Sequence, residues 1–219
     1  MRQLNNFGGS SSMFIVKLNK SCLVTYLGII FGVLAASFAF SKIAFSETNF
    51  MRYSLSFLVL SGVCDMFDGK VARMCKRTKE EKEFGIQLDS LADTFNFLAV
   101  PVIIMLSLNM HSTFDILAFM LLILCGVARL AYFNVHAELD GPVKFYSGLP
   151  VTSTAIIYPL LGLLHGVISE NLFIKIYLIA TYLIAFLFVF NFKCPKLKGS
   201  AYIIVPILAV LLIALLLFI

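Results

Sequence analysis

The sequence predicts an all-α, polytopic membrane helical bundle with about seven transmembrane helices. Two observations concern composition: 60% of the 219 residues are hydrophobic, and only 13% are charged. The third is the length of the apolar runs, which match the roughly 20 residues that a helix needs to cross a hydrocarbon core ~30 Å thick. A soluble globular enzyme cannot bury so many long apolar runs away from water. A disordered chain is also excluded, because such chains are poor in aromatic residues and this one contains 22 Phe.

Seven windows of about 19 residues reach the hydropathy of a membrane span. Their ranges are 23–44, 53–73, 86–108, 114–135, 149–168, 172–192 and 201–219. Residues 1–20 precede them as a cytoplasmic tail, in which 13–20 mixes apolar and basic residues as a helix in the membrane interface would. Residues 21–219 are then expected to form a single membrane-embedded domain.

Charged stretches, prolines and cysteines refine this pattern. The second and third spans each begin or end in charged residues, and Pro101, Pro159 and Pro206 are expected to kink their helices. The charged run 76–83 is expected to be a solvated loop with internal charge pairing. The five Cys show no CxxC or other close pairing, which indicates neither a zinc cluster nor a disulfide framework.

The basic residues follow the positive-inside rule when the N-terminus is placed in the cytoplasm. All of the 17 Lys and Arg except Lys42, Arg52 and Lys175 then lie on the inner side. The net charge of +5 therefore indicates topology and contact with anionic membrane lipids, rather than binding of nucleic acid. The predicted location is the cell membrane, with the inner helix ends facing the cytoplasm.

Two aspartates lie near the inner end of the second span. At 100° per residue, Asp65 and Asp68 share a helix face with Gly69, Ala72 and Arg73. The two small residues leave room for a flat or bulky ligand against the backbone, and the arginine offers a guanidinium fork for phosphate. This face combines anionic, open and cationic positions.

A second pair of aspartates begins the third span. Gly85, Asp89 and Asp93 recur every four residues and share a face, close to which Asn96 would line the same cavity or bond a neighbouring helix. A short loop joins the two helices, so their acidic faces are expected to meet. Four ionised carboxylates there would cost on the order of several kcal/mol each to desolvate unless a cation offsets them. Oxygen-only ligands favour Mg²⁺ or Mn²⁺ over zinc.

The spacing of these residues closely resembles the signature of the CDP-alcohol phosphatidyltransferase family. All eight fixed residues are present, as Asp65-x2-Asp68-Gly69-x2-Ala72-Arg73 and Gly85-x3-Asp89-x3-Asp93. One departure is the link between the Arg and the second Gly, which has eleven residues here, 74–84, and is shorter in most of the family. The resemblance implies a six-helix family core, to which this chain adds a C-terminal span.

A second region resembles the phosphatidylserine synthase branch of that family. Its residues are Ala128-Arg129-Leu130-Ala131-Tyr132-Phe133-Asn134 and Tyr146-Ser147-Gly148-Leu149-Pro150. Tyr132 stands where many members of the branch have a second Arg. Arg129 lies within a predicted span and would hold the acceptor carboxylate or a phosphate, unless it snorkels to the interface. Lys144 is the second basic candidate for acceptor binding.

The resemblance also implies a reaction and a set of residue roles. A phosphatidyl group would pass from CDP-diacylglycerol to L-serine, giving phosphatidylserine and CMP, and the enzyme would be a homodimer. A pair of divalent ions, Mg²⁺ or Mn²⁺, would assist, and Asp93 would accept the serine hydroxyl proton. The metal ligands would be Asp65, Asp68, Asp89 and Asp93. The residues that bind the nucleotide of CDP-diacylglycerol would be Gly69, Ala72, Arg73, Gly85 and Thr25.

Three alternatives stay open. A sister enzyme would use glycerol 3-phosphate or inositol, although a phosphorylated acceptor calls for more basic residues than Arg129 and Lys144. A cation transporter would also place acids in the membrane, but it would not require the Gly, Ala and Arg spacing, and the second half of the chain does not repeat the acidic element. A purely structural bundle leaves the cost of the four acids unexplained.

Overall fold

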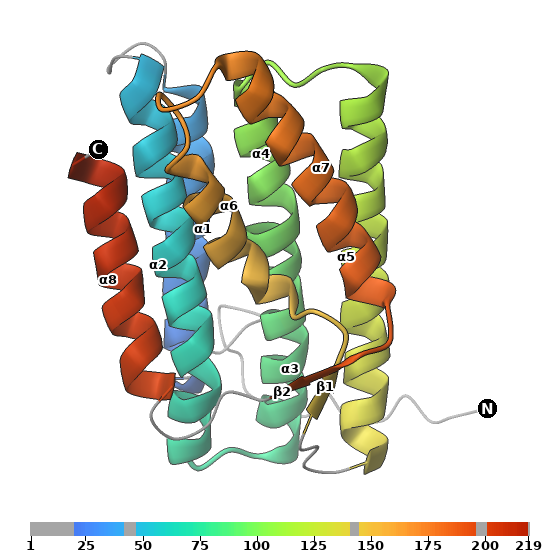
Figure 1. Cartoon of the computed structure of the whole chain (residues 1–219). Coiled ribbons are helices and arrows are strands. Elements are labelled where there is room, and N and C mark those ends of the chain that lie inside the picture. Colours follow the sequence, from blue (N-terminus) through green and yellow to red (C-terminus); the bar gives the residue numbers. More distant parts are fainter. Residues whose placement is uncertain (1–19, 42–46, 141–144, 196–200, 219) are drawn as a thin grey trace, which may run out of the picture.

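The computed structural model describes residues 20–41, 47–140, 145–195 and 201–218. Most of these residues are helical, and the helices stand side by side as a bundle (Figure 1). The predicted tail, with all but the last residue of the interfacial segment 13–20, lies outside the described residues, as does Lys144. The helical bundle confirms the predicted fold class.

The helical rods alternate in direction along the chain (Figure 1). The elements in chain order are η1 (Lys20–Cys22), α1 (Leu23–Phe40), α2 (Glu47–Met74), α3 (Lys79–Asp93), η2 (Thr94–Ala99), α4 (Val100–Ser107), α5 (Thr113–Asp140), β1 (Phe145–Ser147), η3 (Val151–Ser153), α6 (Thr154–Gly162), α7 (Glu170–Val189), β2 (Lys193–Pro195) and α8 (Ala201–Phe218). Because η2 joins α3 to α4 without a break, these three elements form one long rod.

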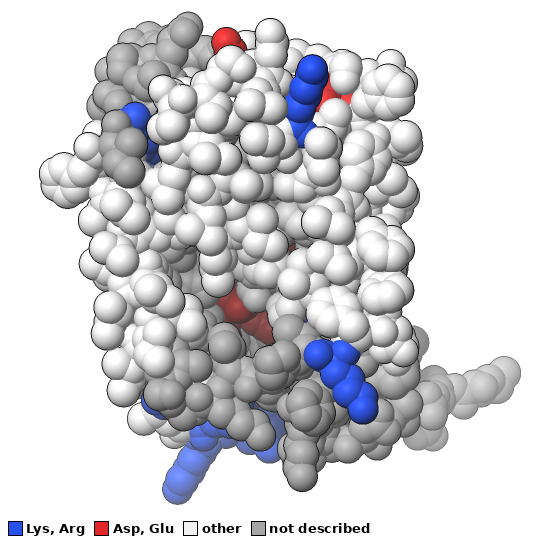
Figure 2. Space-filling model, viewed as in Figure 1, with Lys and Arg blue, Asp and Glu red and all other residues white. Residues whose placement is uncertain are grey.

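Four helical stretches are long and apolar enough to cross a membrane. They are Leu23–Phe40, Lys79–Ser107, Thr113–Val135 and Glu170–Val189. The apolar stretches of α6 and α8 are shorter, and α2 carries both charged ends and two of the aspartates. Figure 2 shows Lys and Arg toward the two ends of the bundle and acidic atoms at depth in a recess nearer the lower end. This distribution suits a polytopic membrane protein.

The fifth span is shorter than the sequence predicts. Residues 149–168 were expected to be one helix, but the helical part ends at Gly162 and turns follow. Gly166 has a φ of 84°, a left-handed conformation that glycine adopts without the steric penalty of a Cβ. The backbone therefore leaves the helix well before the apolar run ends.

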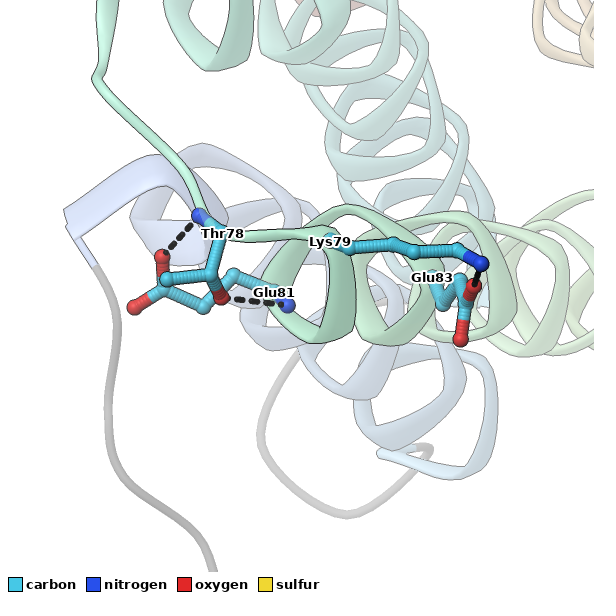
Figure 3. A network of polar contacts seen from close by, with 4 residues as sticks. All are labelled: Thr78, Lys79, Glu81 and Glu83. Atoms are coloured by element: carbon cyan, nitrogen blue, oxygen red, sulfur yellow. Dashed lines mark hydrogen bonds and ion pairs between the residues drawn. The ribbon is translucent and has the colours of Figure 1, made fainter.

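The charged run 76–83 is partly helical, which corrects the expectation of a loop. Thr78 caps α3, because its hydroxyl accepts a hydrogen bond from the Glu81 amide (3.2 Å) while its own amide donates to the Glu81 carboxylate (2.8 Å; Figure 3). The expected internal charge pairing is present between Lys79 and Glu83, 3.8 Å apart. Both side chains are exposed, so the pair contributes little to stability.

Small residues let α1 pack closely against α2. Gly28, Gly32, Ala35 and Ala39 are buried along one side of α1, at the three- and four-residue spacing typical of close helix contacts. The Ser54 hydroxyl of α2 donates to the Ala35 carbonyl at 2.6 Å. The two backbones therefore approach each other directly in the half of α2 that precedes the aspartates.

A short antiparallel strand pair closes the lower end in Figure 1. Phe145 pairs with Pro195 and Ser147 with Lys193, which joins the segment after α5 to the segment after α7. Gly148 follows with a φ of 74°, and a Cβ there would lie 2.9 Å from the Phe188 carbonyl oxygen. This explains why a glycine occupies the position. The α2 to α3 turn lies at the same end of the bundle.

Candidate active site

The acidic faces of α2 and α3 meet, as the sequence predicts. One carboxylate oxygen from each of Asp65, Asp89 and Asp93 lies within 4.8 Å of the other two. Asp68 is joined to α1 instead, because the Thr25 hydroxyl donates to its Oδ2 at 3.2 Å. The four aspartates and Thr25 therefore come together from three different helices.

These residues line a small pocket, here called the carboxylate pocket. Its lining residues are Thr25, Gly28, Ser61, Asp65, Asp68, Asp89, Ala92, Asp93, Asn96 and Phe97. Asp68 and Asp93 are each 8% exposed, so their carboxylates are largely withdrawn from solvent. Within the described part of the chain no Lys or Arg forms an ion pair with any of the four aspartates. Ion pairs with Lys or Arg of the α2 to α3 turn therefore do not neutralise these acids.

Of the five predicted nucleotide residues, Thr25 lines the carboxylate pocket and the other four lie beside it. Gly69 and Arg73 are exposed, and Ala72 and Gly85 are half-buried, one or two helical turns closer to the α2 to α3 turn. A Cβ added at Gly69 would meet nothing nearer than an Arg73 nitrogen at 3.8 Å. At Gly85 the nearest atom would be an Arg77 nitrogen at 3.5 Å. The glycines leave the surface open just beyond the carboxylates.

Arg129, the acceptor candidate among the described residues, lies apart from the pocket lining. Arg129 is 8% exposed; its Nη2 donates to the Gly148 carbonyl at 3.3 Å, and its guanidinium lies 6.0 Å from the centre of the Phe133 ring. The same helix contacts the acidic one, because the Asn134 amide donates to the Ser90 hydroxyl at 2.8 Å. The structure thus links the Arg129 helix to the turn of α3 that carries Asp89 and Asp93.

Some residues that line the pocket lie outside the aspartate signature. Ser61 precedes Asp65 by four residues and therefore shares its helix face, and Gly28 follows Thr25 by three. Asn96, for which two roles stayed open, lines the pocket. It lies in the π-helical segment η2, a local change of helical period that sequence spacing does not reveal.

The residues present fit a divalent cation. Carboxylate oxygens from two helices converge, and the group contains no His nitrogen and no Cys sulfur. Among the described residues, the four aspartates have no Lys or Arg as an ion-pair partner. Hard ions such as Mg²⁺ and Mn²⁺ prefer oxygen ligands of this type. Such a site could also bring a phosphate ester close to a carboxylate base.

Comparisons with known proteins point in the same direction. The family model described as CDP-alcohol phosphatidyltransferase matches residues 18–218. A CDP-diacylglycerol–serine O-phosphatidyltransferase of Saccharomyces cerevisiae is 37% identical over 127 residues, which are 53% of this chain and 44% of that protein. One of Methanocaldococcus jannaschii is 30% identical over 193 residues, which are 87% of this chain and 82% of that protein.

A further relative carries a different name. The archaetidylserine synthase of Methanothermobacter thermautotrophicus is 30% identical over 142 residues, 64% of this chain and 59% of that protein. The aligned part thus spans less than two thirds of this relative and less than half of the yeast one. No solved structure matches the chain. The family model nonetheless covers almost the whole sequence, including every residue of the aspartate signature, so the chain belongs to the CDP-alcohol phosphatidyltransferase family of transferases.

Proposed function

We propose that this protein transfers a phosphatidyl group from CDP-diacylglycerol to L-serine, giving phosphatidylserine and CMP. The observation that carries the proposal is the convergence of Asp65, Asp89 and Asp93 within 4.8 Å in a pocket between three helices. The choice of serine is supported by the names of the relatives in yeast and Methanocaldococcus. The aspartate geometry supports the reaction type independently of that choice.

The four aspartates would hold one or two divalent ions, Mg²⁺ or Mn²⁺. Asp65, Asp89 and Asp93 present oxygens close enough to share an ion, and Asp68 lies beside them, oriented by Thr25. When bound, such ions neutralise charge on the phosphate and on the attacking and leaving oxygens. Gly69, Ala72, Arg73 and Gly85 would hold the nucleotide outside the pocket.

Asp93 would serve as the general base. The serine hydroxyl oxygen bonds to the phosphorus that carries the diacylglycerol group, and the bond from that phosphorus to the CMP oxygen breaks. The hydroxyl proton passes to the Asp93 carboxylate, and CMP leaves with the bonding electrons on its phosphate oxygen. Asp93 is 8% exposed, is the last residue of the signature and lines the pocket.

Arg129 and Lys144 would bind the acceptor. The guanidinium of Arg129 is held near the Gly148 carbonyl and the Phe133 ring. A fixed guanidinium suits the serine carboxylate, because its fork matches two carboxylate oxygens. The Asn134 contact to Ser90 supports this placement, because it connects the Arg129 helix to the acidic turn of α3.

The active site would face the cytoplasm, with the protein in the cell membrane and its N-terminus inside. The charge distribution supports this orientation, because most of the 17 Lys and Arg then lie on the inner side. A cysteine introduced at Thr78 should resist a membrane-impermeant thiol reagent in intact cells, and ready labelling would reverse the orientation. The homodimer stays a prediction, which light scattering of the detergent-solubilised protein measures directly.

The test of the reaction is CMP release by the purified protein. CDP-diacylglycerol is supplied with L-serine, inositol or glycerol 3-phosphate in parallel, and the lipid product is identified by mass spectrometry. Serine alone should support release of CMP and formation of phosphatidylserine. Release with inositol or glycerol 3-phosphate but not with serine would overturn the acceptor while keeping the reaction type. Absence of release with every alcohol would overturn the reaction type.

A further inference from the structure

The deep end of the carboxylate pocket contains two polar side chains that the proposed reaction does not use. Ser61 is fully buried and Asn96 is 3% exposed. Neither the Ser61 Oγ nor the Asn96 Oδ1 has a hydrogen-bond partner among the described residues, although both side chains line the pocket. An unpartnered buried polar atom costs about 1–3 kcal/mol, so two in one pocket point to a bound ligand.

Both side chains are placed by the elements that carry the metal ligands. Ser61 lies one helical turn before Asp65 on α2. Asn96 lies just past Asp93, in the π-helical segment η2, where the Val100 amide donates to the Phe95 carbonyl five residues earlier. Single turns of π-helix are frequent at functional sites, because they change which side chains face a pocket. A ligand held by Ser61 and Asn96 would therefore lie directly behind the carboxylates.

Glycines on α1 leave room for the Asn96 side chain. A Cβ at Gly32 would collide with the Asn96 Oδ1, and one at Gly28 would lie 3.3 Å from the Cys64 Cβ and 3.7 Å from the Asn96 Nδ2. A water molecule between Ser61 and Asn96 would give both unpartnered atoms a hydrogen-bond partner.

We propose that Ser61 and Asn96 together hold one water molecule, and that this water supports the divalent ion bound by the aspartates. Both groups can accept and donate hydrogen bonds, so a water between them can orient its own oxygen or protons toward Asp65 and Asp93. Ser61 and Asn96 are then positioning residues of the metal site. The inference rests on the proposed function only in requiring that the carboxylate pocket binds a divalent ion.

The test measures Mn²⁺ binding to the purified, detergent-solubilised protein in the absence of substrate, using the electron paramagnetic resonance signal of free Mn²⁺. Loss of a group that supports metal ligands typically weakens metal affinity about 10–100-fold. Ser61→Ala and Asn96→Leu should each weaken Mn²⁺ binding within that range. Because both residues hold the same water, the double variant should bind Mn²⁺ with nearly the same affinity as the more impaired of the two single variants.

Matched controls come from polar residues that the structure shows as satisfied. Ser54→Ala removes a buried hydroxyl from the same helix, but that hydroxyl donates to the Ala35 carbonyl and does not line the pocket. Tyr177→Phe removes a hydroxyl that donates to the Tyr158 carbonyl, also outside the pocket lining. Both variants should keep the wild-type Mn²⁺ affinity. Gly32→Ala, on the facing helix, should displace Asn96 and weaken Mn²⁺ binding without any change in the polar residues.

The outcomes separate this inference from the proposed function. Wild-type Mn²⁺ affinity in Ser61→Ala, Asn96→Leu and Gly32→Ala, in a protein that still makes phosphatidylserine, would overturn the inference alone. Fully additive losses in the double variant would overturn the shared water. A wild-type protein that binds no Mn²⁺ would overturn both the inference and the proposed metal site. Thermal unfolding without metal shows that each variant is folded before its binding is compared.

Discussion

Two clusters of buried polar residues in the described part of the bundle differ in whether their hydrogen bonds are complete. In the tyrosine cluster, formed by Tyr158, Tyr177 and Thr181, the Tyr177 hydroxyl donates to the Tyr158 carbonyl at 2.6 Å. The Thr181 hydroxyl donates to the Tyr177 carbonyl at 2.8 Å and lies 3.1 Å from the Tyr158 hydroxyl. In the carboxylate pocket, Ser61 and Asn96 keep unpartnered atoms beside uncompensated acids.

The difference indicates what each group is for. Buried polar atoms that satisfy one another hold helices together and leave nothing for a ligand to bind. Buried acids and amides without partners destabilise the ligand-free protein, and proteins keep them where a bound ligand supplies the missing interactions. The tyrosine cluster is therefore expected to affect stability without affecting catalysis. Substitutions in the carboxylate pocket are expected to affect catalysis more than stability.

The largest effect should come from Asp93→Asn. The amide keeps one oxygen and the shape of the side chain, but it cannot accept a proton near neutral pH. CMP release should therefore fall by on the order of 10²-fold or more, while binding of CDP-diacylglycerol survives in weakened form. Steady-state kinetics at saturating Mn²⁺ measures the rate of CMP release, and an equilibrium binding assay measures the affinity for CDP-diacylglycerol. Near-normal turnover would mean that the proton leaves by another route.

Asp65→Asn and Asp68→Asn should instead lose nucleotide and metal binding together, because both residues lie on the helix face that carries Gly69 and Arg73. Each variant is compared with Asp93→Asn in the same binding assays. If Asp65→Asn and Asp68→Asn bound CDP-diacylglycerol as well as the wild type does, the division of roles between α2 and α3 would have to be abandoned.

Arg129 sharpens the comparison, because it combines features of both groups. It is buried and donates to Gly148, as a structural residue would, but its charge suits a substrate carboxylate. Arg129→Lys keeps the charge and loses the fork, so KM for serine should rise about 10-fold while KM for CDP-diacylglycerol stays unchanged. A fall in thermal stability with both KM values unchanged would place Arg129 in the structural class.

Tyr177→Phe tests the structural group. The substitution removes one hydroxyl whose bond to the Tyr158 carbonyl is complete, in a side chain that is 1% exposed. The free energy of unfolding should fall by about 1 kcal/mol, with kcat and Mn²⁺ affinity unchanged. Denaturation in mixed detergent micelles measures the stability. A large loss of activity in a stable Tyr177→Phe variant would remove the distinction between the two groups.

The smallest effect is expected from Thr25→Val. This substitution removes the hydroxyl that donates to Asp68 but keeps the branched shape of the side chain. One lost hydrogen bond of about 1 kcal/mol should weaken binding of CDP-diacylglycerol by a few-fold. Equilibrium binding of the nucleotide lipid at fixed Mn²⁺ provides the measurement. Equal affinity in wild type and variant would show that Thr25 does not orient Asp68.

The sequence predicted the acidic site better than the helix boundaries, for physical reasons. Helical period is strict over one or two turns, so spacing alone placed Asp65, Asp89 and Asp93 on facing sides of adjacent helices. The boundaries depend on local hydrogen bonds instead. Thr78 begins α3 inside a charged run, and turns end α6 at Gly162 inside an apolar run.

Other features could not be found from spacing at all. The π-helical segment η2 changes the period after Asp93 and brings Asn96 into the pocket lining. The β1 to β2 pairing joins residues far apart in the chain, and the left-handed Gly148 near Arg129 packs against carbonyl oxygens at the end of α7. Such features follow from tertiary packing rather than from local sequence.

Equilibrium dialysis of Mn²⁺ against the purified protein, without substrate, tests the central claim most directly. The wild type should bind one or two ions per chain, Asp65→Asn should lose most of this binding, and Tyr177→Phe should bind as the wild type does. These results would show that the carboxylate pocket is the ligand site and that the tyrosine cluster is structural. Equal Mn²⁺ binding by Asp65→Asn and wild type, or loss of binding in a folded Tyr177→Phe variant, would contradict the account.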